Sequence, residues 1–437
     1  MQELNTLKAL FSFGAKHLLR RIKTRAYDIT LPNTPFFVPS HGISAQIDYS
    51  TRVKPHFGPP HPASALLISE PLVAGPSAIY AQYLLSGLSR ARIHHPLLTP
   101  AAPGWGLFSK EETRYVQTAQ GLEWLGWRPF VYRRILKWIA DQEPEILHGI
   151  SEHTAHIAAA LAEELKLPYV LTIHSYLEGS TLRITPRCRA VIAVSEPLRE
   201  HLVNDVRIPK DRVRVISPGV SDAPVPGIPN FFTATIVSPD EPGAELETGL
   251  HVAESPPDAR LVVSIGDFNK TSDYATFMEA TRHIIDRQGD ACSIVVCGEG
   301  PQESSLRKFC RELHLDRRVT FCHGHSEVER LMGEADVYVQ TTRREGFAVR
   351  ALQAMAQGVP VVAAANGAIF ELIEDGVTGY IVPPANHEQL GERILALLAD
   401  ADLRKKIGAA GRQSALEHYS VENMMDATLD VYRDVAG

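Results

Sequence analysis

Residues 342–364, TRREGFAVRALQAMAQGVPVVAA, carry the most specific arrangement of chemical groups in the chain. Their order indicates a loop, a short helix, a glycine stop and then a buried strand. Glu345 lies just before the helix, whose N-terminus is expected around residues 346–349, and Gln353 lies near its middle. A helix N-terminus offers unpaired N–H groups and the positive end of a dipole. The segment therefore predicts a site for an anion such as a phosphate.

Apolar stretches separated by helical stretches surround this segment. Strands are expected at 64–70, 145–151, 169–175, 190–196 and 260–266, with five more to follow. Continuous apolar strands connected by helices are typical of parallel sheets that are covered on both faces. We therefore expect an α/β protein with two doubly wound, Rossmann-like domains, 65–250 and 251–415, facing each other across a cleft. In such sheets, ligands bind at the carboxyl ends of the strands.

The two ends of the chain differ from this pattern. Within residues 1–64, the first 26 carry six lysines and arginines against one acid, and their apolar residues recur at helical spacing. This predicts a basic amphipathic helix on an anionic membrane surface, followed by an extension. The same pattern also fits a helix packed on the protein itself or on another subunit. Residues 416–437 are expected to form a helix that crosses back to the N-terminal domain.

Composition excludes several classes of function. The chain has 437 residues and a net charge of −7, which gives no support for nucleic-acid binding. No apolar run reaches 18 residues, and no secretory signal is recognisable. The five cysteines show no CxxC spacing, so we expect reduced core thiols and a cytoplasmic protein, with peripheral membrane contact through residues 1–26 as an option. No Asp-x-Asp signature ends a strand, so no metal is expected.

The segment from 344 to 384, REGFAVRALQAMAQGVPVVAAANGAIFELIEDGVTGYIVPP, resembles retaining family 4 glycosyltransferases of the GT-B fold. The shared features are Glu-Gly-Phe, Ala-Met, the Gly-Val-Pro-Val-Val strand and the Glu-Asp-Gly-x-Thr-Gly turn. GEGP at 298–301, AVSEPLREHL and RVRVISPGV agree more weakly but in the right order. The resemblance covers about residues 65–437.

This resemblance implies transfer of a sugar, with retention, from a nucleotide diphosphate sugar to a hydroxyl acceptor. It needs no cofactor, because the sugar nucleotide is the substrate. The implied catalytic residues are Glu345, which contacts the transferred sugar, and His174, which ends a strand at the cleft. The implied donor-binding residues are Gln353, Gly346, Phe347, Ala348, Lys270, Gly75 and Arg344. Dipole stabilisation alone could also explain Glu345, and an ordinary polar position could explain His174 or Gln353.

Several positions depart from the family pattern. Asp267 and Ser272 stand where the family has an arginine and a lysine that meet the diphosphate, and Lys270 lies two residues from the second position. Gln353 replaces the glutamate that grips the ribose, and Gly75 is what remains of a Gly-Gly loop. These departures leave an alternative open, a catalytically impaired GT-B module that acts as a binding or scaffolding partner.

Overall fold

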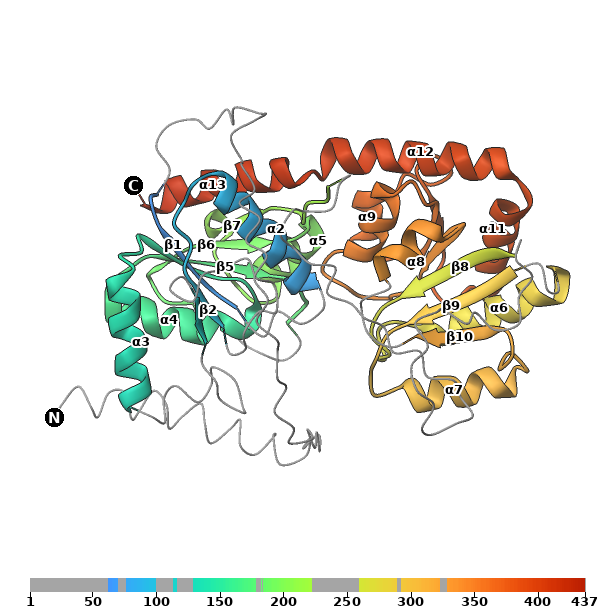
Figure 1. Ribbon diagram of the computed structural model, residues 1–437, viewed down its shortest axis with the longest axis horizontal. Helices are drawn as coiled ribbons and strands as arrows, with labels where there is room; N and C mark the ends of the chain where they lie inside the picture. The colour runs from blue at the N-terminus through green and yellow to red at the C-terminus, as the bar shows by residue number, and fades with distance from the viewer. Residues whose placement is uncertain are drawn as a thin grey trace, which may run out of the picture.

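A computed structural model describes residues 62–69, 76–99, 113–115, 129–177, 182, 184–221, 259–288, 292–322 and 328–436. They form two α/β domains that lie side by side, joined along one side by the C-terminal helices (Figure 1). The expected helix at 1–26, the extension after it up to residue 61, and Gly75 lie outside the described residues.

The first domain is built on a parallel sheet of seven strands in the order β3-β2-β1-β4-β5-β6-β7. The strands are β1 (Ala65–Ile68), β2 (Leu97–Thr99), β3 (Thr113–Tyr115), β4 (Ile146–Gly149), β5 (Tyr169–Ile173), β6 (Cys188–Ala193) and β7 (Val213–Val215). The central strands β1, β4 and β5 are buried along their whole length. Burial on both faces explains why they read as continuous apolar stretches.

The second domain repeats this plan with six parallel strands in the order β10-β9-β8-β11-β12-β13. They are β8 (Arg260–Ile265), β9 (Cys292–Cys297), β10 (Val319–Cys322), β11 (Val337–Gln340), β12 (Val361–Ala364) and β13 (Tyr380–Val382). The order reverses between β8 and β11 here, and between β1 and β4 in the first domain. The predicted pair of doubly wound domains is therefore confirmed, and ligands in such sheets bind beside this reversal.

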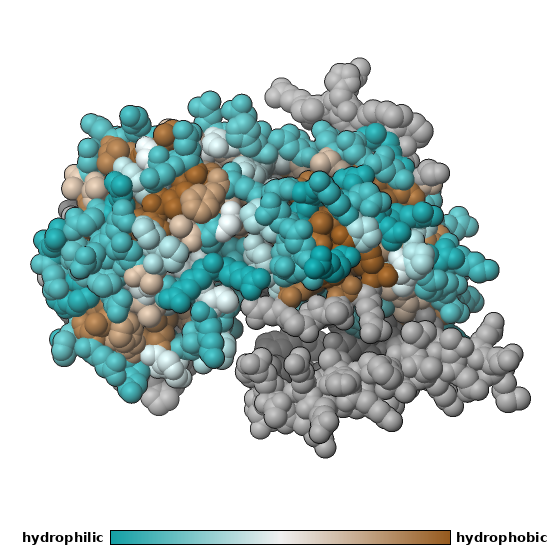
Figure 2. Space-filling model, turned by 180° about the vertical axis from the view of Figure 1, so that it is seen from behind, coloured by the Kyte–Doolittle hydropathy of each residue, from teal (hydrophilic) through white to brown (hydrophobic). Residues whose placement is uncertain are grey.

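Helices cover both sheets. The first domain has α2 (Pro76–Arg90), α3 (Pro129–Asp141), α4 (Ala155–Leu165) and α5 (Glu196–Asn204). The second has α6 (Tyr274–Gln288), α7 (Glu303–Glu312), α8 (Val328–Glu334), α9 (Val349–Ala356), α10 (Ile369–Leu372) and α11 (His387–Ala399). In the described part of the chain, no helix combines the length and the apolar character that crossing a membrane requires. The surface opposite the view of Figure 1 is largely hydrophilic, with smaller hydrophobic patches between (Figure 2).

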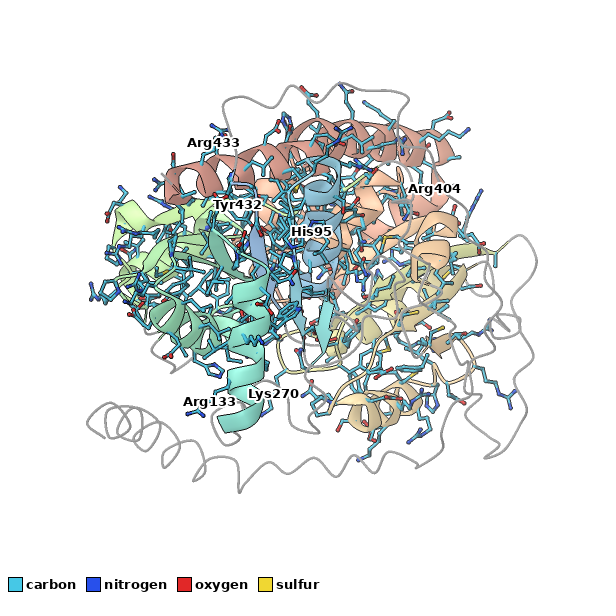
Figure 3. All side chains as sticks on the ribbon, turned by 60° about the vertical axis from the view of Figure 1, so that its left-hand side comes forward. His95, Arg133, Lys270, Arg404, Tyr432 and Arg433 are labelled. Atoms are coloured by element: carbon cyan, nitrogen blue, oxygen red, sulfur yellow. The ribbon has the colours of Figure 1, made fainter. Side chains whose placement is uncertain are left out.

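The last two helices span both domains. α12 (Ala401–His418) lies along the second domain, and α13 (Val421–Ala436) lies on the first (Figure 1). Tyr432 of α13 reaches the first sheet, where its hydroxyl is 2.7 Å from Nδ1 of His148 (Figure 3). The other ring nitrogen of His148 is 2.8 Å from the hydroxyl of Thr172. His148 is fully buried with both nitrogens bonded, so it ties α13 to the sheet.

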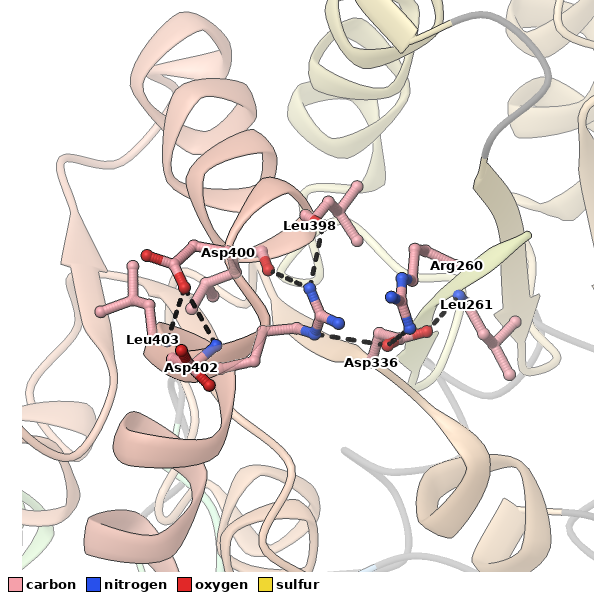
Figure 4. Close-up of polar contacts among 9 residues, drawn as sticks. Arg260, Leu261, Asp336, Leu398, Asp400, Asp402 and Leu403 are labelled. Carbon is pink, nitrogen blue, oxygen red and sulfur yellow. Dashed lines mark hydrogen bonds and ion pairs between the residues drawn. The ribbon is translucent and has the colours of Figure 1, made fainter. Parts of the chain in front are cut away.

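The start of α12 is fixed by a cluster of polar contacts (Figure 4). Asp400 caps the helix by accepting bonds from the N–H groups of Asp402 and Leu403. Arg404 is buried and pairs with Asp336, which also accepts the N–H of Leu261 at 2.9 Å. The cluster lies at the amino ends of β8 and β11, opposite the edge where a ligand binds, so its role is structural.

The five cysteines are all buried free thiols. Cys188, Cys292 and Cys297 are strand residues whose side chains contribute to the cores. Burial raises the pKa of the Cys188 thiol to about 12 and that of Cys292 to about 11, which makes both poor nucleophiles. The described cysteines are therefore core residues, as expected from their spacing.

Candidate active site

The segment 341–349 connects the carboxyl end of β11 to α9, beside the reversal of strand order. Ala348 precedes the helix, and no side chain caps the N-terminus of α9. Phe347 anchors the segment by packing its ring 5.6 Å from that of Tyr419. Gly358 ends the helical stretch with φ of +78°, which glycine adopts without strain. The N-terminal amides of α9 are thus held rigidly at the ligand-binding edge of the second sheet.

The two domains meet at Gly346. A β-carbon at this position would collide with the carbonyl oxygen of His174, so only glycine allows the two backbones to approach this closely. The Ser195 hydroxyl donates a 2.6 Å bond to the Gly346 carbonyl and accepts one from the N–H of Leu198. Ser195 therefore caps α5 and also joins the domains. This contact brings the predicted residues His174 and Glu345 to the same place.

Glu345 lies in a polar cluster at the carboxyl ends of two strands, β11 and β12. Its carboxylate accepts bonds from the amide of Gln340, at 3.3 and 3.2 Å, and from the amide of Asn366, at 3.4 Å. Gln340 is held in turn by the hydroxyl of Tyr338, 2.7 Å from its amide oxygen. Burial raises the pKa of Glu345 to about 7, although both amide bonds lower it. A buried carboxyl group with a raised pKa and only neutral hydrogen-bond partners is typical of a functional site. It is not typical of a surface acid that a helix dipole stabilises.

His174 presents one free nitrogen. Its Nε2 is 3.0 Å from the carbonyl oxygen of Ile150, which can only accept, so Nε2 carries the proton. Nδ1 is then an acceptor, and among the described residues this buried atom has no hydrogen-bond partner. Burial lowers the pKa of His174, although Glu152 opposes that shift, so the ring is neutral. The hydroxyl of Ser69, which follows β1, is also buried and has no hydrogen-bond partner in the described part of the chain.

Gln353 faces the same edge from the second turn of α9. It is 8% exposed, and its amide oxygen accepts a 3.0 Å bond from the guanidinium of Arg350. Arg350 lies in the first turn of the helix and is half-buried. The two residues are three positions apart, so they share one face of the helix.

The loop after β8 carries the departures from the family pattern. Asp267 is exposed, and its carbonyl oxygen accepts a 2.5 Å bond from the hydroxyl of Ser272, which is buried. Ser272 therefore holds the loop and offers no charge. Lys270 is exposed, and no ion pair to it is found among the described residues, so its role stays a prediction.

The two arginines before Glu345 are both engaged elsewhere. Arg343 pairs with the buried Asp273 at 2.9 Å. The guanidinium of Arg344 lies 4.3 Å from the ring centre of Tyr176 in the first domain. Arg344 is thus placed at the contact between the domains, and its assignment to donor binding stays a prediction.

Sequence reasoning missed Gln340, Asn366 and Arg350. Gln340 ends β11 and Asn366 follows β12, and both positions become meaningful only when strand order is known. Arg350 could have been found, because it is three residues from Gln353 on a predicted helix. Within the described residues no group of three or more His, Cys, Asp or Glu side chains could hold a metal ion.

Both domains match models of known protein families. Residues 77–223 match the family described as Glycosyltransferase Family 4, and residues 251–414 match the family described as Glycosyl transferases group 1. An uncharacterized glycosyltransferase of Methanocaldococcus jannaschii is 24% identical over 386 residues, 83% of this chain and 95% of that protein.

Two solved structures show the same fold. A glycosyltransferase of Rickettsia africae superposes with a TM-score of 0.65 at 17% identity, over 86% of this chain and 98% of that one. The Anabaena protein HepE, solved in complex with UDP and glucose, superposes with a TM-score of 0.64 at 14% identity. That match covers 85% of this chain and 100% of HepE.

Proposed function

Since the chain belongs to the family 4 glycosyltransferases with a GT-B fold, we propose that it is an active transferase. Its donor is a nucleotide diphosphate sugar, and its acceptor is a hydroxyl group. The observation that carries this proposal is the uncapped N-terminus of α9, flanked by Glu345 and facing His174 across the contact at Gly346.

The N-terminus of α9 suits the donor diphosphate. Breaking the bond between the sugar and the phosphate leaves about one further negative charge on the nucleotide, and the N–H groups and dipole of the helix stabilise it. Because the charge develops during the reaction, this interaction favours the transition state over the bound substrate. The structural neighbour HepE was solved in complex with UDP and glucose, which supports a sugar nucleotide as the donor.

Glu345 and His174 suit the transferred sugar. The Glu345 carboxylate is held by two neutral amides and retains capacity to accept hydrogen bonds from sugar hydroxyls. Nδ1 of His174 can accept one more O–H, and a buried acceptor gains most when a ligand supplies its missing bond. Together they orient the sugar with its reacting carbon toward the phosphate that α9 holds.

We infer transfer with retention from the resemblance to retaining enzymes. The bond from the sugar C1 to the phosphate oxygen breaks, and a bond from C1 to the acceptor oxygen forms on the same face. The acceptor hydroxyl gives its proton to the departing phosphate oxygen. The leaving group acts as the base, so the reaction needs no protein base beside the acceptor.

Thermal shift with nucleotides tests the proposal. UDP or GDP, at about 100 times its dissociation constant, should stabilise the full-length protein by about 2.7 kcal/mol and raise Tm. UMP and GMP are the matched controls, and they should give smaller shifts because they lack the second phosphate. If neither diphosphate raises Tm, the donor site does not exist. Binding without release of sugar from UDP- or GDP-sugars would favour the non-catalytic alternative.

A further inference from the structure

The N-terminus of α5, on the side of the first domain that faces the second, contacts two loops of the second domain (Figure 1). The hydroxyl of Ser195 donates to the carbonyl of Gly346, in the loop after β11. The N–H of Glu196 donates a 2.8 Å bond to the carboxylate of Glu371, in the helix α10 that follows β12. Two consecutive residues of the first domain therefore hold both loops that surround Glu345. We call these two hydrogen bonds the α5 clasp.

Glu371 is bound from two directions. Its carboxylate suits the start of α5, because the first N–H groups of a helix lack partners within the helix and the dipole favours a negative charge there. The carboxylate of Glu196 itself pairs with Arg199 on the same helix. The backbone carbonyl of Glu371 accepts a 2.6 Å bond from the hydroxyl of Tyr419, which lies between α12 and α13. The first domain thus holds the side chain of Glu371, and the C-terminal segment holds its backbone.

Asn366 connects α10 to Glu345. The amide oxygen of Asn366 accepts the N–H of Ile369, at the start of α10, at 3.0 Å. Its amide nitrogen donates to the carbonyl of Thr342 at 2.8 Å and to the carboxylate of Glu345 at 3.4 Å. A displacement of α10 away from α5 would therefore move one of the two amides that hold the Glu345 carboxylate.

The α5 clasp also sets the distance between the two domains at the site. His174 belongs to the first domain and Glu345 to the second, and the carbonyl of His174 lies directly against Gly346. Both side chains can contact one sugar only while this approach is maintained. A misplacement of about 1 Å can cost a reaction about 100-fold in rate, so the contacts that maintain the approach matter for turnover.

We propose that Glu371 is a positioning residue, which binds the N-terminus of α5 and thereby keeps Glu345 opposite His174. This inference rests on the proposed function and gives Glu371 no contact with the sugar or the nucleotide. The diphosphate site at the N-terminus of α9 belongs to the second domain alone. Loss of the Glu371 contact should therefore lower turnover and leave diphosphate affinity intact.

Turnover and diphosphate affinity of the full-length protein test the inference, measured as release of sugar from UDP- or GDP-sugars and as calorimetric titration with UDP and GDP. Glu371→Ala should lower kcat about tenfold and leave diphosphate affinity within about twofold. Glu371→Gln retains an oxygen that accepts the Glu196 N–H, so its kcat should stay within about threefold of the parent value. The matched control is Glu374→Ala, which removes an exposed acid three residues away and should change neither quantity. Circular dichroism confirms that each variant is folded.

Small-angle X-ray scattering without nucleotide tests the α5 clasp independently of the donor site. Glu371→Ala should have a larger radius of gyration than the parent protein, whereas Glu371→Gln and Glu374→Ala should match the parent. An unchanged radius of gyration or an unchanged kcat in Glu371→Ala would overturn the inference and leave the proposed function standing. So would an equal loss of kcat in Glu371→Gln, or a loss of diphosphate affinity in Glu371→Ala. A parent protein without turnover would overturn the proposed function and this inference together.

Discussion

The carboxyl edges of the two sheets have the same topology but differ in the charge of the side chains that they carry. On the first sheet, β1 and β5 end in Ser69 and His174, which are neutral and carry unpartnered atoms within the described residues. On the second sheet, Glu345, Arg350 and Asp267 surround the reversal of strand order with formal charges. The first edge offers neutral polar groups, whereas the second carries formal charges beside the uncapped N-terminus of α9. We propose that the second edge binds the donor diphosphate and that the two edges meet at the transferred sugar.

The two histidines at the first sheet differ in the hydrogen bonding of their ring nitrogens. His148 and His174 lie on adjacent strands and are both buried. Burial lowers the pKa of His148 to about 3, and both of its nitrogens are bonded within the protein. In His174, Nε2 is bonded, whereas Nδ1 has no hydrogen-bond partner among the described residues. Burial alone therefore does not distinguish the two histidines, and the unpartnered nitrogen is what supports our proposal that His174 binds the ligand.

Glu345→Ala should give the largest effect. Removing the acceptor of the sugar hydroxyls should lower kcat at least about 100-fold, as for other groups that stabilise a transition state. The affinity for the nucleoside diphosphate should change little, because the carboxylate does not contact the nucleotide. Steady-state kinetics and calorimetry on the same preparation check both halves. Lost nucleotide affinity with normal turnover would reverse the assignment.

The pH dependence of turnover should follow Glu345. Burial raises its pKa to about 7, so the carboxylate is mostly ionised at about pH 8 and mostly protonated at about pH 6. The ionised form is the stronger acceptor, so kcat/KM should fall about tenfold over that range. A flat profile between these values would show that ionisation of Glu345 has no part in turnover.

Stability should respond to pH in the opposite direction. The folded protein holds the Glu345 proton up to about pH 7, whereas the unfolded chain releases it near the ordinary glutamate pKa of 4.5. The folded state therefore binds more protons between these values, and its stability falls as pH rises through the window. Urea unfolding of the parent protein and of Glu345→Gln, measured across that range, gives the difference in pH dependence between the two proteins. If burial did not raise the pKa of Glu345, that difference would vanish.

His174→Ala tests the role of the carboxyl edge of the first sheet. Loss of one hydrogen bond to the sugar should lower kcat/KM about tenfold and leave nucleotide affinity within about twofold. Tyr432→Phe in α13 is the matched control, because it removes one hydrogen-bond partner of His148 on the adjacent strand β4. It should cost about 1–2 kcal/mol of stability and leave kcat/KM unchanged. Equal effects of the two variants on turnover would remove the distinction between the histidines.

Asp267→Asn should give the smallest effect. An acid about 4 Å from a phosphate charge would cost about 4 kcal/mol at an effective dielectric constant of about 20. In the structure Asp267 is exposed, so water screens the repulsion to about 1 kcal/mol. Affinity for the diphosphate should therefore rise about fivefold in calorimetry. Weaker binding by the variant would mean that Asp267 contacts the ligand.

The sequence predicts the scaffold far better than the site. Apolar strands and the glycine-flanked helix 349–356 follow from local pattern, and Glu345 is recognisable from its place before that helix. The partners of Glu345 are not, because Gln340 and Asn366 meet it only through the order of β11 and β12. Gln353 illustrates the limit most clearly. Its sequence position identifies it as the counterpart of the ribose-binding glutamate of the family, and only the structure shows that its amide oxygen accepts a bond from Arg350.

A crystal structure of the full-length protein with the bound nucleoside diphosphate tests the division between the two edges most directly. We expect the diphosphate within hydrogen-bonding distance of the N–H groups at the N-terminus of α9. The sugar-binding side, at Glu345 and His174, should remain open. A diphosphate bound instead at the carboxyl edge of the first sheet, away from α9, would contradict the assignment of charge recognition to the second domain.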